Sequence, residues 1–344
     1  MRVAVVGAGI IGMTSALAVK TAFPRLDVHV FAAEFSPDTT GDGSAGLWCP
    51  YLFGETPLDK VLKWAGAAYR WMDECWRAGL ASEMGIALLP IYRLTSDPRG
   101  YSDSTWTKLV HGARKLTPEQ LRRLNDEHGS SYREGWMFMT YTAEPILLLP
   151  WLTEKFVAAG GELRKREVHA FHELVADGYD LIVNCSGLGA RLLAADSTVQ
   201  PIRGQVARVT ASGMMHAYIV EDEDMYCVIP NFEKTILGGT HQENDYDCTP
   251  RAEDSKFIYD GCSRMLPALK GIEPGTEWVG LRPGRLSVRL EPEVVESPRG
   301  GKFTVIHNYG HGGSGVTLSW GCAMDVVAIV RNILGLELPL SSHL

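Results

Sequence analysis

Near its C-terminal end the sequence holds one turn with an unusual density of glycines, namely Gly310, Gly312, Gly313 and Gly315. A short apolar strand from residue 304 is expected before this turn, and a helix that reaches about Leu334 after it. Glycines let a backbone approach a flat ligand closely, because no Cβ stands in the way. The helix would direct free N–H groups and partial positive charge at the turn. The pattern favours a ring system that gains negative charge during its reaction; a connection that merely permits tight packing is the alternative.

A second glycine motif opens the chain, where Gly7, Gly9 and Gly12 follow an apolar run over residues 1–6. Strand, G-x-G-x-x-G turn and helix in this order are typical of a dinucleotide site. The first glycine makes the tight turn, the second lets the backbone approach a pyrophosphate, and the third lets the helix lie close to the strand. The next strand, expected over residues 27–32, should end at an acidic residue that binds a ribose. Here that position is Ala33, and the carboxylate comes one residue later, at Glu34.

Composition excludes several classes of protein. The chain has 344 residues, of which 45% are hydrophobic and 22% charged, and this length suggests two domains. A formal net charge of −8 argues against a nucleic-acid partner. We expect no membrane span, because no apolar stretch approaches the ~18–20 residues needed to cross a bilayer. We also expect no signal or transit peptide, because the sequence begins directly with a strand. Seven scattered cysteines without a Cys-x-x-Cys pair favour a reduced compartment and no metal site.

Strand and helix signals alternate along the chain. Residues 58–80 read as a helix whose aromatic residues we assign to the core, and Thr117 begins another helix. After an insertion the strand–helix alternation resumes, with a helix over 150–159 and strands over 162–168 and 180–187. Antiparallel strands are then expected over 204–210, 225–230 and 235–239. The acidic run Glu221–Asp224 between them reads most simply as a solvated loop.

Seven motifs in this order resemble the FAD-dependent D-amino-acid oxidase and D-aspartate oxidase family over nearly the whole chain. They are Gly7-Ala-Gly-Ile-Ile-Gly12, Ala45-Gly-Leu-Trp48, Val183-Asn-Cys-Ser-Gly187, Arg203-Gly-Gln205, Leu237-Gly-Gly239, Val279-Gly-Leu-Arg-Pro283 and Val305-Ile-His-Asn-Tyr-Gly-His-Gly-Gly313. The resemblance implies an α/β fold with a discontinuous Rossmann-like FAD-binding domain (1–55, 146–200 and 286–344). A mainly antiparallel substrate-binding domain with helices (56–145 and 201–285) would complete the chain.

The resemblance also implies the residues of the cofactor site. These are Gly7, Gly9, Ile10, Ile11 and Gly12 at the pyrophosphate, Glu34 and Val168 at the adenosine end, Ser186 near the phosphates, and Ser44, Gly46, Leu47, Gly312, Gly315, Val316 and Thr317 along the flavin. For the substrate it implies that Arg282 and Tyr226 bind the α-carboxylate and that the carbonyl of Gly313 accepts a hydrogen bond from the amine. Arginine suits this task because its planar fork meets both carboxylate oxygens. Tyr51, His241 and Ser314 are further candidates for the substrate pocket. His307 is expected to be a hydrogen-bonded structural histidine.

The expected reaction transfers the α-hydrogen as hydride to FAD, with O2 as final acceptor, and gives a 2-oxo acid, ammonia and hydrogen peroxide. The substrate signals are divided. The segments 186–191 and 279–283 lean toward the D-aspartate branch, whereas Trp48 and Tyr51 lean toward the neutral branch. Because residues 218–225 contain no Arg or Lys, we predict neutral D-amino acids as substrates, with basic ones as a further class. D-aspartate oxidation is the alternative, for which His241 or Arg285 would supply a second cation.

The final tripeptide, Ser342-His343-Leu344, resembles a peroxisomal import signal, so we expect an import receptor as partner and a peroxisomal location. The oligomeric state stays open. Two other classes remain as alternatives: a nicotinamide-dependent dehydrogenase, since G-x-G-x-x-G serves both cofactors, and a non-catalytic flavoprotein.

Overall fold

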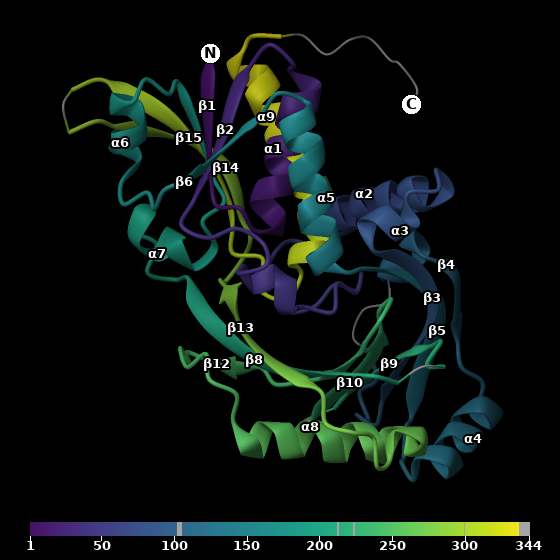
Figure 1. Cartoon of the computed structure of the whole chain (residues 1–344). Coiled ribbons are helices and arrows are strands. Elements are labelled where there is room, and N and C mark those ends of the chain that lie inside the picture. Colours follow the sequence, from purple (N-terminus) through teal and green to yellow (C-terminus); the bar gives the residue numbers. More distant parts are fainter. Residues whose placement is uncertain (102–104, 212, 223, 299, 337–344) are drawn as a thin grey trace.

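The computed structural model describes residues 1–101, 105–211, 213–222, 224–298 and 300–336, and these residues build two β-sheets. In Figure 1 the first sheet lies in the upper half, beside helices α1, α5 and α9. The second sheet lies in the lower half, and α8 covers its far face. The tripeptide Ser342–Leu344 lies outside the described residues.

The first sheet has six strands in the order β14-β15-β7-β1-β2-β6. Its strands are β1 (Arg2–Val6), β2 (Asp27–Ala32), β6 (Glu162–Lys165), β7 (Leu181–Asn184), β14 (Arg289–Glu296) and β15 (Lys302–Tyr309). All neighbours are parallel except β14 and β15, which form an antiparallel pair. The carboxyl ends of β1, β2, β7 and β15 therefore meet at one edge, where ligands of such sheets bind.

Helices from distant parts of the chain pack on this sheet. They are α1 (Ile10–Ala22), α5 (Pro145–Ala158), α6 (Phe171–Ala176), α7 (Ala190–Leu193) and α9 (Gly315–Ile333). Gly12 permits the close contact of α1 with the turn before it, since a Cβ there would lie 1.9 Å from the carbonyl oxygen of Gly7. This packing agrees with the role predicted for Gly12, which is to let the helix lie close to the strand.

The second sheet has nine strands and is antiparallel except for the pair β3–β9. Its path is β12-β8-β11-β10-β9-β3-β5-β4, and β13 pairs with β8. Its strands are β3 (Ile86–Thr95), β4 (His111–Lys115), β5 (Glu134–Ala143), β8 (Gln200–Val209), β9 (Ala217–Glu221), β10 (Met225–Pro230), β11 (Thr235–Gly238), β12 (Gln242–Glu243) and β13 (Thr276–Gly284). The strands of the two sheets come from the chain segments expected for the two domains; the domain boundaries themselves stay a prediction.

The remaining helices are α2 (Leu58–Arg77), α3 (Ala81–Met84), α4 (Pro118–His128) and α8 (Ala252–Met265). The predicted start of α4 is confirmed. The Thr117 side chain accepts a hydrogen bond from the backbone N–H of Gln120 at 3.2 Å, and the Gln120 side chain accepts one from the Thr117 N–H at 2.9 Å. This reciprocal cap satisfies two of the free N–H groups at the helix start.

Helix α9 corrects the expectation that no stretch is long and apolar enough to cross a membrane. Gly315–Ile333 passes that test with a mean hydropathy of 1.3, but 56% of its apolar window is buried within the protein. It packs against α1 and α2, and Trp320 stacks on Trp71 of α2 at a centroid distance of 4.5 Å. Its apolar surface is therefore used in the protein core.

Other boundaries differ in detail from the prediction. Helix α5 begins at Pro145, because a proline fits the first turn of a helix, where its missing N–H is not needed. Strand β6 ends at Lys165, three residues early. Among the aromatic residues of α2, Trp64, Tyr69 and Trp71 are buried as expected, whereas Trp76 is 39% exposed. All seven cysteines are free thiols.

Candidate active site

A cavity of about 570 Å³ runs between the two sheets and meets both glycine motifs. The end of the cavity at the turn that joins β1 to α1 is lined by Gly7, Gly9, Ile10 and Ile11. Gly7 has φ +108°, and a Cβ there would lie 2.4 Å from the carbonyl oxygen of Cys185. A Cβ on Gly9 would meet nothing within 4 Å. The start of α1 therefore opens onto the cavity with its free N–H groups, an arrangement that suits a phosphate.

The carboxyl ends of β2, β6 and β7 extend this wall. Glu34, Val168 and Ser186 all line the cavity. The Glu34 carboxylate also forms an exposed ion pair with Lys165 at 2.9 Å. The one-residue displacement of the acid from its expected position thus leaves it on the cavity wall, where it can contact a ribose.

The C-terminal glycine turn forms the opposite wall. Gly312 has φ +53°, and a Cβ there would lie 2.0 Å from the carbonyl oxygen of Leu52. A Cβ on Gly313 would lie 2.5 Å from the ring of Tyr51. The cavity is lined here by Gly312, Gly313, Gly315 and Val316. It is also lined by Ser44, Gly46 and Leu47, from the segment that follows β2. Helix α9 begins here, so its partial positive charge faces the cavity.

Two residues predicted for direct contact instead hold the wall in place. The Ser314 hydroxyl accepts a hydrogen bond from the Tyr51 N–H and donates one to the Tyr51 carbonyl, each at 2.7 Å. The Thr317 hydroxyl likewise bonds the Cys49 N–H and carbonyl, each at 3.1 Å. Neither Ser314 nor Thr317 lines the cavity. They fix segment 49–51 against the start of α9 and thereby orient the Tyr51 ring.

Arg282 is a cation without an acidic partner among the described residues. It lies on β13 and lines the cavity. Its Nη1 donates to the carbonyl oxygens of Thr240 at 3.1 Å and Arg203 at 3.4 Å. The guanidinium rests on Gly204, where a Cβ would lie 2.2 Å from it. Burial lowers the pKa of Arg282, yet an arginine stays charged at any physiological pH. A partly buried cation of this kind favours an anionic ligand.

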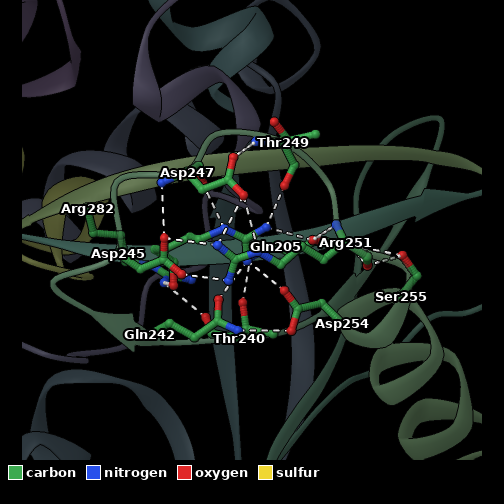
Figure 2. A network of polar contacts seen from close by, with 11 residues as sticks. Gln205, Thr240, Gln242, Asp245, Asp247, Thr249, Arg251, Asp254, Ser255 and Arg282 are labelled. Atoms are coloured by element: carbon green, nitrogen blue, oxygen red, sulfur yellow. Dashed lines mark hydrogen bonds and ion pairs between the residues drawn. The ribbon is translucent and has the colours of Figure 1, made fainter.

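A buried polar network fixes the backbone around Arg282 (Figure 2). Its centre is Arg203, a fully buried arginine that forms an ion pair with Asp254 at 2.6 Å. Gln205 and Thr240 connect this network to Arg282, since the Gln205 N–H donates to the Thr240 hydroxyl at 2.9 Å. The Arg203-Gly-Gln205 motif is thus the support on which the Arg282 guanidinium lies.

The structure corrects the assignment of Tyr226. Its ring points to the face of the second sheet that carries α8, where a Cβ on Gly261 would lie 1.9 Å from it. Its hydroxyl donates to Asp224 at 3.2 Å, and Tyr226 does not line the cavity. The neighbouring Cys227 does line it. Successive side chains of a strand point to opposite faces, so a shift of one residue in the assumed register exchanges the two roles.

Two other candidate cations do not reach the pocket. His241 is exposed and does not line the cavity. Arg285 forms an ion pair with Asp196 at 2.8 Å, and its Nη1 donates to the Ser287 carbonyl at 2.7 Å. Neither side chain is positioned for a substrate carboxylate.

The acidic run also differs from its prediction as a solvated loop. Glu221 ends β9, lines the cavity and forms an ion pair with Arg93 at 2.7 Å. Asp222 accepts hydrogen bonds from the Thr95 hydroxyl at 2.9 Å and the Ser96 N–H at 2.6 Å. Sequence analysis missed Glu221, Cys49 and Cys227 as cavity residues. Side chains alternate between the two faces of a strand, so Ile219 and Glu221 share one face, and this pattern could have identified Glu221.

The two histidines near the glycine turn have different surroundings. His307 is buried and hydrogen-bonded to Glu293 at 2.8 Å and Asn184 at 3.2 Å, as expected for a structural histidine. His311 lines the cavity, and its Nε2 has no hydrogen-bond partner among the described residues. Burial lowers the pKa of His311 to about 3, so the ring is neutral. In the described residues no group of three or more His, Cys, Asp or Glu side chains could hold a metal ion.

Known proteins are similar to this chain in sequence and in fold. Residues 2–329 match the family model described as FAD dependent oxidoreductase. The D-aspartate oxidase of Homo sapiens is 33% identical over 329 residues, which cover 96% of this chain and 94% of the human protein. The D-amino acid oxidase of Dugesia ryukyuensis is 35% identical over 338 residues, which cover 97% of this chain and 98% of that protein. In fold, the chain is similar to glycine oxidase from Geobacillus kaustophilus, with a TM-score of 0.76 at 18% identity and coverage of 98% and 96% of the two chains.

Proposed function

The chain belongs to the family of FAD-dependent oxidoreductases that includes D-amino-acid and D-aspartate oxidases, and on that premise we propose that it oxidises D-amino acids. FAD, when bound, would supply the two-electron acceptor for the α-hydrogen, and O2 would be the final acceptor and become hydrogen peroxide. The oxidised amino acid hydrolyses to a 2-oxo acid and ammonia. Membership of an FAD-dependent family sets aside the nicotinamide-dependent alternative.

The residues present fit FAD. Two glycine turns line one cavity, and only glycine fits at Gly7 and Gly312, where a Cβ would lie 2.4 Å from the Cys185 carbonyl oxygen and 2.0 Å from the Leu52 carbonyl oxygen. The first turn adjoins the start of α1 and suits the pyrophosphate; the second adjoins the start of α9 and suits a ring that gains negative charge. Ser44, Gly46 and Leu47 would lie along the same ring, and Glu34 and Val168 at the adenosine end.

A single observation carries the substrate assignment: the partly buried guanidinium of Arg282 faces the cavity beside the C-terminal glycine turn without an acidic partner among the described residues. A substrate carboxylate would complete the ion pair that the fold leaves open. A planar guanidinium would hold both carboxylate oxygens and so fix the orientation of the α-carbon.

Tyr51 is the residue we assign to the second contact with the carboxylate, in place of Tyr226. Burial raises the pKa of Tyr51 to about 12, and the nearby Arg282 opposes this shift. The hydroxyl is therefore protonated at neutral pH and can donate a hydrogen bond. The ring lies against Gly313, whose carbonyl is the proposed acceptor for the substrate amine. Orientation by these groups, in which Ser314 and Thr317 hold the wall, is the contribution of the protein to the rate.

The described residues offer no well-matched side-chain base in this part of the cavity. His311 faces the cavity, but a pKa of about 3 makes it a weak proton acceptor. We therefore expect the substrate amine to lose its proton to solvent before the α-hydrogen is transferred.

Neutral D-amino acids, with basic ones as a further class, are the substrates we propose, and D-aspartate oxidation is the alternative. An acidic side chain needs a second cation, and the two candidates for it are exposed or already paired (His241 and Arg285). The similarity to a D-aspartate oxidase supports the alternative. No residue yet identified in the cavity favours an anionic side chain.

The proposed function is tested by a peroxide-coupled assay of the FAD-loaded protein against D- and L-isomers of alanine, methionine, arginine and aspartate. We expect peroxide from D-isomers only. Activity confined to L-isomers would reverse the stereochemical assignment, and a colourless protein that does not bind added FAD would refute the whole site.

A peroxisomal location is a further proposal, which rests on Ser342-His343-Leu344. A fluorescent protein that ends in this tripeptide should accumulate in peroxisomes, and the same protein with His343 and Leu344 deleted should not. Equal distribution of the two would remove the proposal.

A further inference from the structure

Glu221 brings a carboxylate into the wall of the cavity, in the second sheet. It is the last residue of β9, its side chain is 21% exposed, and it lines the same cavity as Arg282. Its neighbours on that wall are Ile219, Met225 and Cys227, none of which carries a charge at neutral pH. The cavity therefore has a cationic group at one position of this sheet and an anionic group at another.

Arg93 holds the Glu221 carboxylate from behind. Both Nε and Nη2 of Arg93 contact one oxygen, Oε2, at 2.8 and 2.7 Å. The Arg93 guanidinium lies 4.7 Å from the ring centre of Tyr101 and 4.9 Å from that of Trp106, and it does not line the cavity. No donor to the second oxygen, Oε1, is found among the described residues. The carboxylate thus keeps an open acceptor while its charge is supported on the far side.

The strand registers give the separation of Glu221 from Arg282. Val206, Gly238, Cys227 and Ile219 form one cross-strand row over β8, β11, β10 and β9, and all four line the cavity. Three strand spacings of about 4.8 Å make this row about 14 Å long.

Both charged groups lie on the same side of this row. The Arg282 guanidinium rests on Gly204, two residues from Val206, and Glu221 lies two residues from Ile219. Because β8 and β9 are antiparallel across the row, the two steps lead in the same direction, and the span between the groups stays about 14 Å.

We propose that this span selects D-amino acids with a long cationic side chain, such as D-arginine and D-lysine, whose charged group donates to Glu221 while the α-carboxylate binds Arg282. The proposal rests on the proposed function and names its substrate class. Five bonds of about 1.5 Å separate the cationic group of either side chain from Cα. With a hydrogen bond of about 2.8 Å at each end, such a molecule fills the span when it is extended.

The same geometry discriminates against D-aspartate. Its side-chain carboxylate lies only two bonds from Cα, so it cannot reach across the row. If the molecule shifted toward Glu221, two carboxylates would face each other in a desolvated pocket. A neutral side chain such as that of methionine would occupy the space without using the open oxygen of Glu221.

Two ligands of nearly equal shape isolate the charge. D-citrulline has the length of D-arginine but carries a neutral urea in place of the guanidinium. For the FAD-loaded wild-type protein we expect kcat/KM for D-arginine to exceed that for D-citrulline at least tenfold. The variant Glu221→Gln should reduce this ratio to about one by lowering kcat/KM for D-arginine, since the amide keeps the shape and can still accept from Arg93 but carries no charge.

Asp224→Asn is the matched control. Asp224 belongs to the same β9–β10 turn and its replacement changes the net charge equally, but it is exposed and contacts Tyr226 on the other face of the sheet. This variant should keep the wild-type ratio of D-arginine to D-citrulline. An equal loss in both variants would mean that general attraction of cations, and not the contact with Glu221, sets the preference.

The comparison of D-arginine with D-citrulline in the wild-type protein needs no variant. It therefore tests the preference for a cationic side chain even if Glu221→Gln fails to fold. A ratio near one, or a ratio that Glu221→Gln does not change, would overturn the proposal. Peroxide from D-methionine without a preference for D-arginine would refute this inference alone. No peroxide from any D-amino acid would refute the proposed function instead.

Discussion

Arg203, which is buried, and Arg282, which is partly buried, lie on the paired strands β8 and β13 of the second sheet. The same substitution should destabilise the protein at Arg203 but not at Arg282. We consider Arg203→Met and Arg282→Met, which replace each guanidinium by an unbranched apolar side chain of similar length. The prediction follows from what each guanidinium contacts.

Arg203 is fully satisfied. It donates five hydrogen bonds of 2.6 to 3.0 Å, and one of its acceptors is the carboxylate of Asp254, whose side chain is 10% exposed. The five acceptors are the Asp247 carbonyl, the Gln242 side chain, Asp254, the Gln205 side chain and the Thr249 carbonyl. Removal of one partner of a buried ion pair leaves an uncompensated charge and costs about 3–5 kcal/mol.

Arg282 has only two carbonyl acceptors, at 3.1 and 3.4 Å, both for Nη1. Its removal leaves no charge unpaired and relieves the desolvation of its own charge. We therefore expect Arg282→Met to be between neutral and about 2 kcal/mol more stable than the wild-type protein. Its kcat/KM should nevertheless fall by about 10²–10⁴-fold, because a buried contact to the substrate carboxylate is worth about 3–5 kcal/mol.

The assay is thermal unfolding with saturating FAD, together with urea unfolding, for the wild-type protein and both variants. At about 2 °C per kcal/mol the unfolding midpoint should fall by about 6–10 °C in Arg203→Met and stay or rise by up to about 4 °C in Arg282→Met. Arg203→Lys provides a milder change if Arg203→Met does not accumulate. A comparable loss of stability in the two methionine variants would refute the reasoning, because Arg282 would then be a structural residue with a partner that the fold supplies.

Three further outcomes test the site. Gly204→Ala places a methyl group 2.2 Å from the Arg282 guanidinium, so KM for D-amino acids should rise about tenfold or more while the flavin absorbance of the purified protein is unchanged; an unchanged KM would contradict the position of Arg282. Tyr51→Phe should raise KM about threefold to tenfold. Tyr226→Phe should leave steady-state kinetics unaltered, because the Tyr226 hydroxyl donates to Asp224 outside the cavity; the reverse result would restore the original assignment. The folded-state pKa of His311 lies at about 3, below its unfolded value of about 6.5, so its contribution to stability is present above pH 6.5 and is lost as the pH falls toward 3. His311→Phe should therefore remove about 2 kcal/mol of the stability loss between pH 7 and pH 5 in urea unfolding, and an identical pH dependence in both proteins would show that the ring is not kept neutral by burial.

Local sequence patterns predicted the two glycine turns that we propose for the cofactor. The turn at Gly7–Gly12 directly follows a buried strand and precedes a helix, and the turn at 310–315 has the same setting. In both, the run of glycines signals the turn locally, because glycine permits the positive φ of Gly7 and Gly312. The close approaches of these two glycines, to Cys185 and Leu52, join segments that are distant in the sequence. Arg282 was implied only by the family resemblance of Val279-Gly-Leu-Arg-Pro283, whereas Thr117 fixed the start of α4 through a local cap.

Tertiary structure alone decided which side chains face the cavity. Tyr226 and Cys227 are adjacent in one strand, and a period of two cannot tell which face is the cavity unless the neighbouring strands and α8 are known. Glu221 looked like part of a solvated acidic run, because its partner Arg93 is 128 residues away and comes beside it only through the pairing of β3 with β9. The sequence also could not tell whether Arg203 or Arg282 is free to bind a ligand, because the groups that each contacts lie far away along the chain. Such contacts depend on how strands are ordered and registered, and no local pattern specifies that.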